Sequence, residues 1–162
     1  ILAAVALPRF INLQRDARIA KLQAARGSVS AAAALVHATT LSRGSIADAN
    51  NCGTTGVKAN NSNAATGQVC TESGLVYTVY GYPEVTAFEA NPGILSAAGL
   101  TGIYNPTRAQ LEAEGYTYAA NTGVATFSVV GATDVASCYF TYTQPALSNT
   151  ASIISGLTIS GC

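Results

Sequence analysis

The chain has no methionine among its 162 residues and only one histidine. Because methionine is absent, we expect that Ile1 is not the first residue translated and that a segment before it is missing. The apolar run at the start, ILAAVAL, has seven residues. A helix that spans a membrane needs about 20 apolar residues, so this run is too short to cross a bilayer.

Charged residues are also scarce, at 10% of the chain, where about 25% is typical. A low charge combined with abundant Ser, Thr, Asn and Gly favours an extracellular surface. The net charge of zero is unevenly distributed: six basic residues and one acid occur up to Arg43, and two basic residues and seven acids follow it. A basic arm on an acidic remainder can attract copies of itself, an anionic membrane or a nucleic acid.

Sequence motifs of catalysis are missing. The chain contains no G-x-S-x-G, no P-loop, no H-E-x-x-H and no D-x-[DN]-x-[DN]-G pattern. Glu112 and Glu114 are expected to lie on a solvated face. His37 lies in an alanine-rich segment and is expected to be a packed or surface residue. We therefore expect no enzymatic activity, no catalytic or metal-binding residue and no cofactor.

The four cysteines are Cys52, Cys70, Cys138 and Cys162. None forms a C-x-x-C pair, which argues against zinc. An even number in a polar, weakly charged chain predicts disulfides in an oxidising compartment. Three pairings are possible. We favour Cys52–Cys70 and Cys138–Cys162 because each closes a local loop and would contribute roughly 3 kcal/mol.

Good helix formers dominate from Arg9 to about Thr40. An unbroken helix over 1–41 would be about 60 Å long, against a radius of gyration of roughly 15 Å for a globule of this size. It would therefore protrude from its own domain. Positions at helical spacing form a stripe along this segment: Ile11, Arg15, Ile19, Leu22, Val29, Ala33 and Val36.

The pattern of residues 42–162 predicts a small globular head that contains both helices and strands. Residues 42–68 are expected to form an exposed loop rich in Asn, Gly and Thr. The substitution Asn61→Asp in this loop is expected to have little energetic cost. A strand in LVYTVYGYP, a short helix after Pro92 and a helix from an Asn105 cap to Gly115 follow. Strand-like runs are then expected at 116–119, 124–130, 137–143 and 153–159. The sequence predicts an α+β fold, with a protruding helix at 1–41 that packs on an antiparallel sheet within one globular head at 42–162.

The segment ILAAVALPRFINLQRDARIAKLQAARGSVSAAAALVHA resembles the N-terminal helix of type IV pilins. VYGYPE at 79–84, CYFTYTQP at 138–145 and the final SGC resemble the mannose-sensitive haemagglutinin class of type IVa pilins. The resemblance implies the pilin fold. It also implies a missing N-terminal stretch that carries a methylated phenylalanine and a glutamate. Cys138 and Cys162 match the pair that encloses a variable loop in pilins, whereas Cys52 and Cys70 depart from the commonest pattern.

In function, the resemblance implies a structural subunit of a type IV pilus filament that serves adhesion, surface attachment or motility. Its expected partners are copies of itself, inner-membrane lipid and the assembly machinery before polymerisation, and a carbohydrate or other surface receptor. No specific nucleic acid partner is expected. The expected location is the extracellular pilus, with the inner membrane before assembly. The expected filament-core positions are Ile1, Leu2, Val5, Leu7, Pro8, Phe10, Ile11, Leu13, Ala17, Ala20 and Ala24.

Two alternatives share the same helix. One is a pseudopilin of a type II secretion system. The other is a minor pilin whose head binds a ligand. A carbohydrate site would need amide and aromatic side chains, which Asn60, Asn61, Asn63 and Tyr82 could supply.

Overall fold

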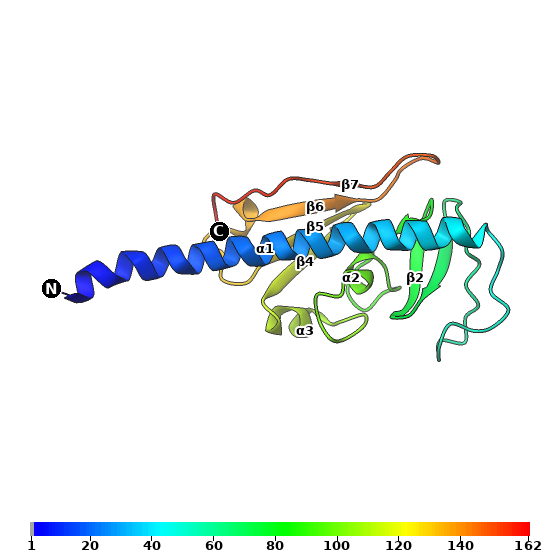
Figure 1. The fold of residues 1–162 in the computed structure, drawn as a ribbon, viewed down its shortest axis with the longest axis horizontal. Helices are drawn as coiled ribbons and strands as arrows, with labels where there is room; N and C mark the ends of the chain where they lie inside the picture. Colours follow the sequence, from blue (N-terminus) through cyan, green and yellow to red (C-terminus); the bar gives the residue numbers. More distant parts are fainter. Residues whose placement is uncertain (1) are drawn as a thin grey trace.

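The computed structural model describes the backbone of residues 2–162 and the side chains of residues 9–162. Helix α1 (Leu2–Arg43) has 42 residues, which span about 63 Å. It continues through Pro8 without unwinding, and Figure 1 shows it along the longest axis of the molecule. Five positions expected in the filament core have side chains outside the described residues: Ile1, Leu2, Val5, Leu7 and Pro8.

The chain after α1 forms two antiparallel sheets, so the fold is α+β, but the single expected sheet is wrong. The first sheet has three strands, in the order β1 (Gly67–Thr71), β2 (Gly74–Val79), β3 (Tyr82–Pro83). The second has four, in the order β4 (Tyr116–Asn121), β5 (Val124–Val129), β6 (Tyr139–Thr143), β7 (Ile153–Ile154). Two short helices lie between the sheets in the chain, α2 (Ile94–Ala97) and α3 (Arg108–Ala113), and the 3-10 turn η1 (Val135–Ser137) lies between β5 and β6.

The main core lies between α1 and the four-stranded sheet. Leu22, Ala25 and Val29 are buried on one side of α1 because they recur every three or four residues. Phe127 of β5 faces its register partner Phe140 of β6, and their ring centroids lie 5.1 Å apart. Four residues of the predicted stripe are fully buried on this side of the helix: Leu22, Val29, Ala33 and Val36.

The same helix also covers the three-stranded sheet. Val36, near the end of α1, packs with Val69 and Val76, which are register partners on β1 and β2. One helix therefore joins both sheets, and its long buried side fixes how the two sheets are placed. Ile11 and Arg15 of the predicted stripe are exposed because the packing begins only after them.

Three local predictions are wrong. Residues 42–68 are not wholly loop, because β1 begins at Gly67 and pairs with β2. The cap of α3 is Thr107 rather than Asn105, since Thr107 and Gln110 exchange the two hydrogen bonds of a capping box. The strand expected at 153–159 is limited to β7, after which a single bridge joins Tyr139 to Thr158.

Candidate functional site

The N-terminal part of α1 leaves the head and exposes large apolar side chains. Phe10, Ile11 and Leu13 are 59%, 60% and 67% exposed, and every residue from 9 to 17 is exposed. Figure 1 shows this part of the helix extending beyond all other elements. Large apolar side chains gathered on one element commonly mark an interaction surface, so this arm, residues 9–17, is the first candidate site.

The expected core positions that the structure describes are all exposed on the single chain. They are Phe10, Ile11, Leu13, Ala17, Ala20 and Ala24. The outward side of α1 continues beyond them with small residues, because Gly27, Ala31 and Ala34 are exposed as well. A Cβ atom added at Gly27 would meet nothing within 4 Å. A second helix could therefore approach this face closely.

Basic side chains of α1 bind the head through main-chain oxygens. Arg18 Nε donates to the main-chain oxygen of Cys162 at 2.6 Å, and Arg26 Nε donates to that of Ser155 at 2.6 Å. Lys21 Nζ donates to the carbonyl oxygen of Glu114 and lies 4.7 Å from the centre of the Tyr116 ring. These cations are therefore already engaged within the chain, a use that the charge distribution alone did not indicate.

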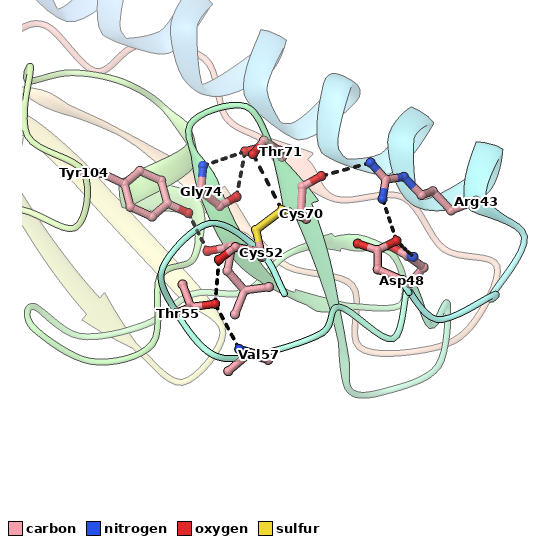
Figure 2. The surroundings of a disulfide bond; sticks show 11 residues. Arg43, Asp48, Cys52, Thr55, Val57, Cys70, Thr71, Gly74 and Tyr104 are labelled. Carbon is pink, nitrogen blue, oxygen red and sulfur yellow. Dashed lines mark hydrogen bonds and ion pairs between the residues drawn. A yellow bond between two sulfur atoms is a disulfide. The ribbon is translucent and has the colours of Figure 1, made fainter. Parts of the chain in front are cut away.

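Both disulfides connect the cysteines that local loop closure favours. Cys138 and Cys162 are buried and joined across 24 residues. Cys52 and Cys70 are joined across 18 residues, with Cα atoms 5.5 Å apart. Figure 2 shows the second bond beside the end of α1. It fixes the segment after α1 to β1, so a polar stretch rich in Asn and Gly acquires a defined position.

A polar cluster ties the end of α1 to the same segment. Arg43 Nη1 and Asn61 Nδ2 each donate to Asp48 Oδ1 at 2.7 Å, and the Arg43–Asp48 pair is drawn in Figure 2. The Asn61 amide, then the Arg43 hydrogen bond and charge, hold the pKa of Asp48 below its ordinary value, while partial burial opposes them. Asn61 is fully buried, so the expectation of an exposed Asn61 is wrong.

The residues proposed for carbohydrate binding do not form one site. Asn63 and Tyr82 line a shallow hollow of about 370 Å³ that does not include Asn60 or Asn61. Asn60 Oδ1 accepts from the main-chain N–H groups of Ser62 and Gln68. Tyr82 stacks on His37 with ring centroids 3.8 Å apart. Three of the four side chains thus have structural contacts: Asn60 and Asn61 in hydrogen bonds and Tyr82 in stacking.

A larger hollow of about 800 Å³, which no pattern in the sequence indicated, lies beside the Cys52–Cys70 bond. Tyr77 and Tyr104 line it, together with polar residues that include Glu72. The only signal in the sequence was the Asn/Gly/Thr stretch between the two cysteines, which does not reveal a hollow.

Tyr104 has a fixed place in this hollow. A Cβ atom at Gly74 would come within 2.6 Å of its ring, and the Gly74 φ of +146° also favours glycine. The Tyr104 hydroxyl donates to the carbonyl oxygen of Leu75, as Figure 2 shows. Burial raises the pKa of Tyr104 to about 12.

Two searches of the described residues were negative. No group of three or more His, Cys, Asp or Glu side chains among them is placed to hold a metal ion. Among the same residues, no helix has the length and the apolar character needed to cross a membrane.

The comparisons with known proteins identify no relative. No protein-family model matches the chain. No curated protein and no solved structure matches it either. A proposal of function therefore depends on the residues of this chain and on the surfaces that they form.

Proposed function

We propose that this chain is a structural, non-catalytic subunit of a type IV pilus filament, which assembles through α1 of neighbouring copies. The observation that carries the proposal is the exposure of Phe10, Ile11 and Leu13 on a helix that extends beyond the head. An isolated helical segment of this length is marginal in water. Packing against other helices would both cover these side chains and stabilise the arm.

The outward face of α1 supports the same proposal. Its exposed alanines and Gly27 leave room for a neighbouring backbone, and Leu35 is 65% exposed beside them. Burial of one large apolar side chain contributes about 1.5–3 kcal/mol. Several such side chains in each copy would supply the free energy that a stable polymer needs.

The proposed location follows from the resemblance to pilins and from the two disulfides. Disulfides form and persist in oxidising compartments outside the cytoplasm. In the proposed sequence of events, the arm contacts inner-membrane lipid and the assembly machinery before it enters an extracellular filament. A surface receptor bound by the head is part of the same proposal.

Electron microscopy of filaments sheared from cells tests the proposal. The chain, with its native upstream segment, is produced in a host that lacks its own pilin. We expect abundant filaments, and we expect Phe10→Asp to lower their yield at least tenfold because an unpaired carboxylate would lie between helices. The matched control is Asn51→Asp, which adds the same charge at an exposed position of the head.

Equal yields from Phe10→Asp and Asn51→Asp would contradict assembly through the arm. Very few filaments from the unsubstituted chain would instead favour a pseudopilin.

A minor pilin with a ligand-binding head is the second candidate. The hollow of about 800 Å³ beside Cys52–Cys70 favours it, because small-molecule sites have volumes of about 300–1,000 Å³. A minor pilin would occur at few copies per filament, which quantitative mass spectrometry of sheared filaments measures directly.

A further inference from the structure

The last ten residues of the chain bond to β6 on one side and to α1 on the other. This strap, residues 153–162, pairs with β6 through β7 and the Tyr139–Thr158 bridge, and main-chain hydrogen bonds also join Ser155 to Thr141 and Gly161 to Ser137. In Figure 1 it is the red segment that ends beside α1. Its main-chain oxygens are bound from the other side by arginines of the helix.

Three arginines of α1 each donate one hydrogen bond to the strap. Arg15 Nη2 binds the main-chain oxygen of Ile159 at 3.2 Å, Arg18 Nε binds that of Cys162 at 2.6 Å, and Arg26 Nε binds that of Ser155 at 2.6 Å. None of the three pairs with an Asp or Glu side chain among the residues whose side chains are described. Their donors are therefore directed at the strap and not at acidic side chains.

A fourth cation holds the opposite flank of α1. Lys21 reaches Glu114 and the Tyr116 ring at the start of β4. From the helical periodicity, the buried residues Leu22 and Ala25 lie between Lys21 on one flank and Arg15 and Arg26 on the other. Bonds on both flanks oppose rotation of the helix about its own axis, in addition to the apolar packing of its buried side.

Arg15 and Arg18 occupy the point where α1 leaves the head. Residues 9–14 are exposed, and Arg15 is the first residue of the described side chains to bond to the head. The 13 residues of α1 before Arg15 extend about 20 Å. A tilt of about 10° at Arg15 would move their far end by about 3–4 Å, a large error beside a helix–helix packing distance of about 8–10 Å.

We propose that Arg15 and Arg18 are positioning residues for assembly, which fix the direction in which the arm leaves the head. The Cys138–Cys162 disulfide takes part because it holds the main-chain oxygen that Arg18 binds. This inference rests on the proposed filament function. It adds that the strap and its disulfide fix the direction of the arm as well as stabilising the head.

The test measures arm direction in the isolated full chain and filament yield in cells. Spin labels on keto amino acids at positions 14 and 120, both exposed, report the arm-to-head distance by double electron–electron resonance. The test variant is Arg15→Met with Arg18→Met. The control is Lys58→Met with Arg108→Met, which removes the same charge from exposed residues of the head that do not bond to the strap.

We expect the distance distribution of the test variant to be at least twice as broad as that of the unsubstituted chain, and its filament yield to fall at least fivefold. The control should keep the original distribution and most of the yield. Arg18→Lys, which keeps a cation and a donor, should give an intermediate width. Unfolding midpoints within a few degrees of the unsubstituted chain would show that the head remains folded.

Identical distributions in the test variant and the control would overturn the inference, whatever the filament yield. A broadened distribution with an unchanged filament yield would also overturn it. If the unsubstituted chain forms no filaments and only the test variant broadens, the role of the arginines in arm direction stands and the proposed filament function fails.

Discussion

At the scale of single residues, Asn61 organises the segment that follows α1. Its Nδ2 group donates to Asp48 Oδ1 and to the carbonyl oxygen of Ile46, both at 2.7 Å. Its φ of +52° lies in the left-handed region, which Asn tolerates better than most residues. Burial, backbone conformation and two hydrogen bonds together require an amide at position 61. The polar composition of the segment does not indicate this requirement.

Asn61→Asp should therefore destabilise the head. The new carboxylate would be buried beside Asp48 and would lose both donated hydrogen bonds. We expect a loss of about 2–4 kcal/mol in the free energy of unfolding at pH 7, measured by urea denaturation with the disulfides intact. Asn51→Asp at an exposed position should change it by less than about 0.5 kcal/mol. A similar small effect at both positions would refute the buried placement of Asn61.

The lowered pKa of Asp48 predicts a pH dependence of stability. Asn61 and Arg43 favour the charged carboxylate in the folded chain. Its contribution is complete above the pKa of an unfolded Asp, about 3.9, and is lost as pH falls through the lower folded value. Urea denaturation between pH 7 and pH 2 should show the stability advantage over Asp48→Asn shrinking below about pH 4. An advantage that stays constant with pH would contradict this prediction.

At the scale of elements, local signals predicted helices better than strands. The propensities of residues 9–40 predicted α1, which ends at Arg43, because helix formation uses neighbouring residues. The cap of α3 was predicted wrongly at Asn105, although Thr107 and Gln110 do have the spacing of a capping box. β1 was missed although its partner β2 follows it directly, because its first residues end a polar stretch rich in Asn and Gly. The course of the strap depends on partners far along the chain: Cys138 and the arginines of α1.

In the candidate sites too, features set by local sequence were predicted and features set by distant contacts were not. Both disulfide pairings followed from loop length, whereas the 800 Å³ hollow depends on Tyr104 meeting Gly74 across 30 residues of chain. The burial of Asn61 depends on Asp48 and Ile46. Contacts of this kind leave no periodic pattern in the sequence.

Gly27 gives a prediction about α1 itself. It lies inside the helix, is exposed, and has open space around its missing Cβ. Gly27→Ala should raise the free energy of unfolding of the isolated chain by about 0.5–1 kcal/mol, because alanine loses less backbone entropy in a helix. Thermal and urea unfolding measure this change. A destabilising effect in the isolated chain would mean that the outward face of α1 is not free there.

At the scale of the whole molecule, α1 has one buried side and one uncovered side. Its buried side joins both sheets through Val29 and Val36, while its outward side and the arm remain uncovered. The buried core and both disulfides lie outside residues 9–17 of the arm. The central claim is that the uncovered side of α1 is buried between copies of this chain.

Site-specific photo-cross-linking in filament-producing cells tests that claim most directly. A benzophenone amino acid is placed at Ala24 on the outward side of α1 and, as the control, at Asn51 on the head; both positions are exposed on the single chain. The account predicts that irradiation of the Ala24 variant joins two copies through α1, with the linked peptides identified by mass spectrometry, and that the Asn51 variant gives no link to a neighbouring α1. Absence of copy-to-copy links at Ala24 in assembled filaments would contradict the account.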